Sequence, residues 1–238
     1  MAGSAHGPAL QPPLWHDRHQ AGAELALRLQ EWRCDPKAVV IGLPRGGVVV
    51  AAAVAEALEL PLVSWSVRKL AQPMAPEVAV GAIAPGGVLL WDEPYLRQLH
   101  LDPLLRRRLV AEQDEELRRR QRLYGDPPGA ALRGRDLLVV DDGVATGMTV
   151  RAALLSLRQI APARLVLAVP VLDERMFARL APQVDALVAL TTVPAIQAVG
   201  LWYDRFEPVM DAQVLDLLAG ARGLGRITGP DEIRQGSA

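Results

Sequence analysis

Residues 137–149 read Leu137-Leu138-Val139-Val140-Asp141-Asp142-Gly143-Val144-Ala145-Thr146-Gly147-Met148-Thr149. Four apolar residues end abruptly in two carboxylates, and a loop of Gly, Ala and Thr then leads into a run of helix formers. This pattern predicts a buried parallel strand, a loop and the first turn of a helix. A helix that begins this way presents unpaired main-chain N–H groups and the positive end of its dipole, which suit a phosphate. Gly143 and Gly147 would let the ligand approach the backbone closely.

The two acids before this loop indicate what else the ligand carries. No lysine stands in the loop and the G-x-x-x-x-G-K-[ST] pattern is absent, so an ordinary nucleotide P-loop fits poorly. Two adjacent carboxylates would repel a phosphate unless they face another group. Either the hydroxyl groups of a sugar or a metal ion would fill that role beside Asp141 and Asp142.

Strands and helices alternate through the rest of the chain. The sequence predicts strands at 38–43, 62–67, 78–83, 88–91, 165–171 and 186–190, and helices at 17–32, 48–60, 102–124, 150–160 and 174–180. The turn at 84–87 makes its two flanking strands a hairpin. The alternation favours an α/β fold with a doubly wound, mostly parallel sheet and helices on both faces. We expect one domain over 15–220, between a disordered tail at 1–14 and a flexible tail at 221–238.

Composition and charge exclude several classes of protein. The 238 residues are 50% hydrophobic and have a formal net charge of -1, which gives no general electrostatic attraction to nucleic acid or an anionic membrane. The arginines of 102–124 alternate with acids at i,i+4 spacing, which is typical of a solvated helix face. The longest apolar stretches, 48–55 and 165–172, are too short to span a bilayer, and the single Cys34 cannot form an internal disulfide. With no secretory signal visible, a cytoplasmic location is expected.

The acid pair, followed three residues later by Thr-Gly-x-Thr, resembles the 5-phosphoribosyl-1-diphosphate (PRPP) signature of type I phosphoribosyltransferases. The resemblance implies that Asp141 and Asp142 hold the ribose 2′ and 3′ hydroxyls and that the following loop wraps the 5′-phosphate. The loop residues it assigns to PRPP are Gly143, Val144, Ala145, Thr146, Gly147 and Thr149. Many members carry an acid just before the Thr-Gly, proposed as the base that deprotonates the incoming nucleobase. Ala145 stands there, so no general base is assigned.

Two further loops follow predicted strands and carry positive charge. Arg45, Gly46 and Gly47 combine close backbone access with a guanidinium that can grip phosphate, and by position they resemble the pyrophosphate-binding loop of the family. Arg68 and Lys69 come before a loop containing Pro73 and Pro76, and several family members have such a pair at the start of their flexible loop. We expect these two cations to form a mobile flap over the diphosphate leaving group. Without a ligand, each loop would simply be a turn with solvated cations.

The segment 199–206 resembles the hood region of 6-oxopurine phosphoribosyltransferases, and the hood is expected to comprise 191–210 with part of the N-terminal helix. The resemblance implies that Trp202 and Tyr203 bind the base and that Asp204 ligates magnesium. Ile196 stands about where those enzymes use a lysine against the purine oxygen, so purine specificity is not supported. A purely structural role, with the aromatic side chains packing the last helix on the sheet, fits the pattern equally well.

The resemblance implies a magnesium-dependent phosphoribosyltransferase in which a nitrogen nucleophile, such as a nucleobase, displaces pyrophosphate from PRPP. Asp141, Asp142, Arg68 and Lys69 would be its catalytic residues. A non-catalytic PRPP-binding regulator on the same fold is the alternative, which Ala145 keeps open. A receiver-like signalling domain would place its acid pair on the first strand, and a flavin domain would not set two acids against a phosphate. The acceptor base and the oligomeric state stay undefined, although family members are often dimers.

Overall fold

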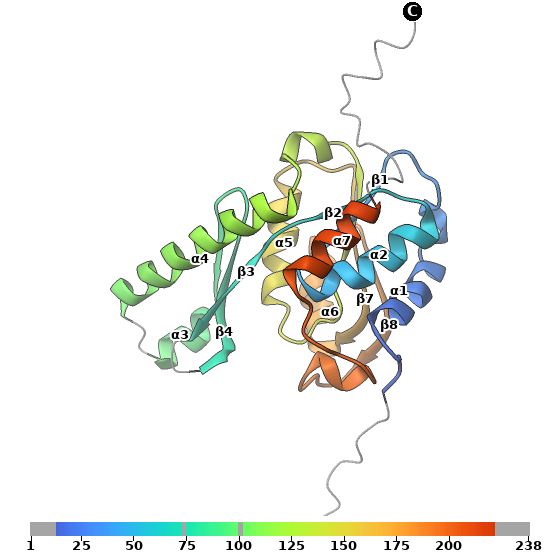
Figure 1. Ribbon diagram of the computed structural model, residues 1–238. Helices are drawn as coiled ribbons and strands as arrows, with labels where there is room; N and C mark the ends of the chain where they lie inside the picture. Colours follow the sequence, from blue (N-terminus) through green and yellow to red (C-terminus); the bar gives the residue numbers. More distant parts are fainter. Residues whose placement is uncertain (1–12, 73–74, 100–101, 222–238) are drawn as a thin grey trace, which may run out of the picture.

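The computed structural model describes residues 13–72, 75–99 and 102–221 (Figure 1). A parallel five-stranded sheet with the strand order β2-β1-β6-β7-β8 forms its centre. These strands are β1 (Ala38–Gly42), β2 (Leu62–Ser64), β6 (Asp136–Val140), β7 (Arg164–Asp173) and β8 (Ala186–Val193). Helices cover both faces, so the predicted doubly wound parallel sheet is confirmed.

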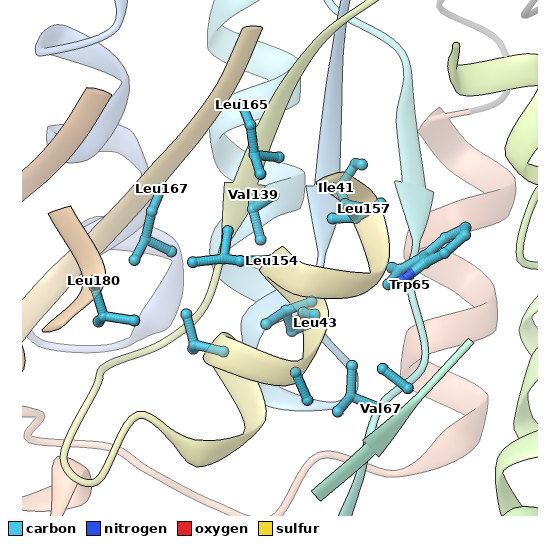
Figure 2. Packing of buried hydrophobic residues seen from close by; sticks show 14 of the residues in the cluster. Ile41, Leu43, Trp65, Val67, Val139, Leu154, Leu157, Leu165, Leu167 and Leu180 are labelled. Atoms are coloured by element: carbon cyan, nitrogen blue, oxygen red, sulfur yellow. The ribbon is translucent and has the colours of Figure 1, made fainter. Parts of the chain in front are cut away.

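The two faces of this sheet follow from the alternation of side chains along each strand. Val40 and Leu138 pack on the face covered by α1 (Arg18–Leu27), α2 (Gly46–Leu58) and α7 (Asp211–Ala221). Their neighbours Ile41 and Val139 face α5 (Met148–Arg158) and α6 (Glu174–Leu180). Figure 2 shows Leu154 of α5 among these side chains. Because strands β1, β6 and β7 are buried on both sides, they read as continuous apolar runs.

A second, antiparallel sheet lies beside the first. It joins β3 (Arg68–Gln72), β4 (Ala75–Ala84) and β5 (Val88–Trp91), followed by α3 (Glu93–Leu99) and α4 (Pro103–Tyr124). The predicted hairpin is therefore confirmed, while β3 and α3 were not predicted. Helix α5 contacts both sheets, and the unit formed by β3, β4, α3 and α4 extends away from the parallel sheet (Figure 1).

Helix α4 has the ends that its sequence predicts. The Asp102 side chain accepts from the main-chain N–H of Leu104, and Gly125 closes the helix in the left-handed conformation, with φ 68°. Two of the expected i,i+4 ion pairs form, Asp114 with Arg118 and Glu116 with Arg120. Arg119 pairs with Glu116 and not with Glu115 as the spacing suggested.

The N-terminal and C-terminal segments meet at one end of the parallel sheet. Trp15 forms a parallel bridge with Tyr203, and both pack in an apolar cluster with Ile196 and Val193. The Asp17 side chain caps α1, but this helix ends at Leu27, short of the predicted residue 32, and a short 3-10 helix, Gln30–Trp32, follows. None of the described helices is long and apolar enough to cross a membrane. Residues 1–12, 222–238 and Pro73, for which we expected tails or a loop, lie outside the described residues.

Candidate active site

The acid pair and the first glycine loop meet at the carboxyl edge of the parallel sheet. Strands β1 and β6 are neighbours with Gly42 opposite Val140, so the residues that follow them emerge side by side. The Leu43 N–H donates to the Val140 carbonyl at 3.0 Å, which fixes the two chain segments together. In open α/β sheets this edge is where ligands bind.

The two glycines of this loop touch the two acids directly. A Cβ added to Gly46 would lie 2.0 Å from Oδ2 of Asp142, and one added to Gly47 would lie 2.7 Å from Oδ1 of Asp141. Any side chain at these positions would displace a carboxylate. The sequence predicted glycines for close approach of a ligand, and the structure adds that they make room for the acid pair itself.

The loop after the acids is held by strand β7. The Val144 N–H donates to the Val171 carbonyl and the Asp173 N–H donates to the Val144 carbonyl, both at 2.9 Å. Gly147, with φ 67°, is the N-cap residue of α5, and no side chain caps this helix. Among the residues that the structure describes, none accepts a hydrogen bond from the main-chain N–H of Ala145, Thr146 or Gly147. The loop thus presents donors that suit an anion.

Asp173 anchors this loop, a role that was not predicted from the sequence. Its side chain is fully buried and accepts from the N–H and guanidinium of Arg175 and from the N–H of Ile196, at 2.6 to 3.0 Å. These bonds, with that of Arg175 foremost, lower the pKa of Asp173. Asp173 thereby links the loop predicted to bind phosphate to Ile196, in the segment 191–210 predicted to form the hood. An acid before a helix signals a cap, but its bond to Ile196 depends on tertiary structure.

The two acids of the pair have different electrostatic surroundings. Burial raises the pKa of Asp141 well above the usual carboxyl range, and the charge of Asp142 raises it further. Burial also raises the pKa of Asp142, but the Arg18 guanidinium opposes this shift. Arg18 Nε donates to Asp142 Oδ2 at 2.8 Å. The sequence analysis assigned no role to Arg18, because nothing local to α1 indicates a partner more than a hundred residues away.

Arg45 and Arg68 lie toward the second sheet. Arg45 is 3.7 Å from Asp211 of α7, which also accepts from the Tyr124 hydroxyl at 2.7 Å. Arg68 donates to Gln113 of α4 through Nε and Nη2 at 3.0 and 2.7 Å. Burial lowers the pKa of Arg68, and the nearby positive charges of Arg120, Arg119 and Arg45 contribute. The structure thus gathers the predicted arginines within electrostatic reach of one another.

Arg68 and Lys69 do not begin a loop, so the prediction of a mobile flap starting at these residues is wrong. Both lie in β3, where Arg68 pairs with Ile83 and Lys69 with Ala82 of β4. The Pro residues that suggested a loop come later, and Pro76 lies inside β4. Strand β4 was predicted at 78–83, but its pairing with Arg68–Gln72 is a tertiary contact that a local sequence pattern does not reveal.

The segment predicted to bind a base and magnesium is largely engaged in internal contacts. Tyr203 is 5% exposed, packs against Trp15 and Phe206, and donates its hydroxyl to the Asp142 carbonyl at 2.6 Å. Its ring is therefore not open for stacking as the prediction required. Trp202 is half-buried at the edge of the same cluster. These contacts give the aromatic residues a structural role, although the partners shown are Trp15 and Arg18 and not the last helix that the alternative named.

Asp204 provides one exposed carboxylate near this cluster. Its Oδ2 lies 3.1 Å from Nδ1 of His16. Within 13–72, 75–99 and 102–221 no group of three or more His, Cys, Asp or Glu side chains is arranged to hold a metal ion. Asp204 therefore stays a predicted ligand of magnesium, which commonly binds with only one or two protein carboxylates.

The fold and the arrangement of this edge are those of a phosphoribosyltransferase-type α/β domain. A family model for the phosphoribosyl transferase domain matches residues 18–198, and the chain belongs to this family of transferases. Proteins from Mycobacterium tuberculosis strains CDC 1551 and H37Rv, provisionally named phosphoribosyl transferases, are each 41% identical over 207 residues. The match covers 86% of this chain and 46% of each relative, so the chain spans about half their length.

A solved structure gives a similar result. The crystal structure of the protein TT1426 from Thermus thermophilus matches with a TM-score of 0.67 and 41% identity. The match covers 87% of this chain and 98% of the other. The parallel sheet with its accompanying antiparallel sheet is therefore shared with a protein of related sequence.

Proposed function

We propose that this chain is a phosphoribosyltransferase that transfers the phosphoribosyl group of PRPP to a nitrogen nucleophile, a nucleobase by preference, and releases pyrophosphate. The observation that carries the proposal is the acid pair placed between an uncapped helix N-terminus and the Arg45 loop. A ligand with two hydroxyl groups flanked by a phosphate and a diphosphate matches these three features in order. Family membership gives independent support.

The ribose would bind between the acids. Asp141 and Asp142 would accept hydrogen bonds from its 2′ and 3′ hydroxyls and fix the sugar in one orientation. As the bond to the diphosphate breaks, C1 gains positive charge, which a carboxylate nearby stabilises. The acceptor nitrogen would attack C1 from the face opposite the leaving group, with inversion, and would lose its proton to a group that the sequence does not identify.

The two phosphate ends would be held by different means. The N–H groups of 145–147 and the hydroxyls of Thr146 and Thr149 would bind the 5′-phosphate. Arg45, Arg68 and Lys69 would compensate the charge of the departing diphosphate. Arg45 would have to exchange its contact with Asp211 for the diphosphate. Because the Arg45–Asp211 contact is 3.7 Å long and only half-buried, this exchange costs little.

Magnesium would accompany the substrate rather than occupy a site of the free chain. Mg²⁺ commonly binds substrate phosphates with only one or two carboxylates from the protein. Asp204 is the carboxylate that the sequence resemblance offers, and its exposure would allow such a contact. The residues described above do not provide the remaining ligands, so they would come from the diphosphate and water.

A second candidate is a PRPP-binding regulator without turnover. Ala145 favours it, because a methyl group replaces the acid that many relatives use as a base. Both candidates require PRPP binding, so calorimetry with PRPP and magnesium is the first test, followed by a screen of nucleobases for pyrophosphate release. Binding with release supports the transferase, and binding without release on any base supports the regulator.

A double variant tests the ribose role. Asp141→Asn with Asp142→Asn should abolish PRPP binding while the protein still melts cooperatively, because amides keep the volume but lose the charge. Glu115→Gln, an exposed change on α4, is the matched control and should bind as the unmodified protein does. Unchanged affinity in the double variant, or no binding by the unmodified protein, would refute the proposal.

A further inference from the structure

Arg18 is a cation placed inside the site by the first turn of α1. Its side chain is 10% exposed, and its Nε donates to Oδ2 of Asp142 at 2.8 Å. A long arginine buried to this extent loses hydration and side-chain freedom, which is costly unless its partners compensate. The partners of the Arg18 guanidinium must therefore compensate for this cost.

Three separate segments meet at this guanidinium. Besides Asp142, its Nη1 donates to the Glu207 carbonyl at 3.1 Å, and its central carbon lies 3.6 Å from the centre of the Phe206 ring. Such stacking places a cation on the negative face of an aromatic ring. Arg18 thus joins α1, the acid pair and the segment that follows Tyr203. A lysine could not make these three contacts together, because it lacks the planar fork.

Two further contacts restrain Asp142, one at its carboxylate and one at its main-chain carbonyl. Gly46 lies so close to Asp142 Oδ2 that a Cβ there would collide with it, and the same Cβ would lie 3.0 Å from Arg18 Nε. The Tyr203 hydroxyl holds the main-chain carbonyl of Asp142 at 2.6 Å. Backbone and side chain of Asp142 are therefore both fixed, and Arg18 is the one cation among the described residues that bonds to its carboxylate.

We propose that Arg18 is a positioning residue that fixes the orientation and charge of Asp142 for ribose binding and couples the 206–207 segment to the acid pair. Its role in binding rests on the function proposed above, whereas its effect on Asp142 does not. Burial raises the pKa of this carboxyl and the Arg18 charge opposes the rise. Among the described residues, the other titratable groups beside Asp142 are the Asp141 carboxyl, whose pKa burial and Asp142 raise, and the Tyr203 hydroxyl, whose pKa burial raises so that it is uncharged at neutral pH.

The test uses the ligand-free protein first. Aspartate labelled with ¹³C at the carboxyl carbon is titrated by NMR, and the Asp142 signal is assigned by its loss in Asp142→Asn. In Arg18→Met the Asp142 signal should titrate at higher pH than in the unmodified protein. Arg28→Met, which removes an exposed arginine from the end of the same helix, should leave it unchanged. If Arg18→Met does not fold, Arg18→Lys replaces it, with a smaller shift expected.

Calorimetry with PRPP and magnesium forms the second arm. Arg18→Met should weaken PRPP binding by up to about 100-fold, the size expected when a hydrogen bond to a charged group is lost. Free guanidinium, at concentrations that leave the melting temperature unchanged, should restore part of the affinity, and urea should not. An unchanged Asp142 titration, or a loss of affinity that guanidinium does not reverse, overturns the proposal. If the unmodified protein does not bind PRPP, the proposed function fails, and the titration alone decides whether Arg18 controls Asp142.

Discussion

Replacement of Gly46 by alanine tests the geometry of the acid pair most directly. The new Cβ would lie 2.0 Å from Asp142 Oδ2, whereas ordinary contact begins at 3.4 Å, so the carboxylate has to retreat by about 1.4 Å. Oδ2 is the atom that accepts from Arg18 at 2.8 Å. A movement of this size breaks that bond, and the backbone of Asp142 cannot follow because Tyr203 holds its carbonyl.

The expected energies follow from these contacts. Loss of a hydrogen bond between charged groups costs about 1.5–3 kcal/mol of stability. Alanine in the first turn of α2 recovers about 0.5–1 kcal/mol of backbone entropy relative to glycine. Gly46→Ala should therefore lower the free energy of unfolding by about 0.5–2.5 kcal/mol. If the acids bind ribose, PRPP affinity should fall by up to about 100-fold, or about 2.7 kcal/mol.

Denaturant unfolding measures the first effect and calorimetry with PRPP the second. Gly220→Ala is the control, because a Cβ at this position of α7 meets no atom within 4 Å. It should leave binding unchanged and should not lower stability. If Gly46→Ala unfolds at the same denaturant concentration as the unmodified protein and binds PRPP equally well, the proposed crowding of Asp142 is refuted.

Three further predictions concern other parts of the site. Asp173→Asn should cost about 2 kcal/mol at neutral pH, because Arg175 and Ile196 lose a charged acceptor. Since the folded pKa of Asp173 is depressed, its contribution is present above about pH 3.9 and is lost as the pH falls further, so the variant and the unmodified protein should converge in acid unfolding experiments. Burial and the bond to Asp211 raise the pKa of Tyr124 to about 12 from 10.0, so its contribution is complete below pH 10 and is lost as the pH rises toward 12; Tyr124→Phe should flatten the loss of stability over this range, and an unchanged slope would contradict the assignment. Removal of magnesium by a chelator should weaken PRPP binding in calorimetry, because the diphosphate charge is then less well compensated; equal affinity would show that the protein cations suffice.

The central sheet was predictable from the sequence because its strands are buried on both faces. Residues 137–140 and 165–171 are continuous apolar runs, and each ends in a polar residue or a loop where the strand leaves the core. The caps of α1 and α4 were also predictable, since Asp17, Asp102 and Gly125 act on their immediate neighbours. These signals are local, and the alternation of strands and helices then restricts the topology.

The second sheet was only half predictable. The hairpin at 78–91 has a turn signal, but strand β3 consists of Arg68-Lys69-Leu70-Ala71-Gln72, which carries no β-branched residue. Its strand conformation comes from pairing with β4 and from packing against α4. Two cations and a nearby proline therefore suggested a loop, but the pairing with β4 makes this segment a strand.

The candidate site was likewise only partly predictable from the sequence. The sequence placed the acid pair and its loop together because they are contiguous, and the strand order brings Gly46 and Gly47 to them. Arg18 and Asp173 escaped detection because their partners are distant in sequence: Arg18 reaches Asp142, and Asp173 reaches Ile196. No periodicity or spacing marks such contacts, since they depend on how elements already formed pack together.

Arg18 also reduces the electrostatic repulsion that the acid pair would exert on a phosphate in the following loop. Two adjacent carboxylates stand directly before a loop suited to phosphate, and two unit charges about 4 Å apart near a protein surface interact by about 4 kcal/mol. Arg18 balances the charge of Asp142 at 2.8 Å, whereas burial favours the protonated form of Asp141. The pair therefore presents less negative charge to the loop than two free carboxylates would. A phosphate at 143–147 is then compatible with acids one to six residues away, and Arg18 supplies on the acid side the positive charge that the loop lacks.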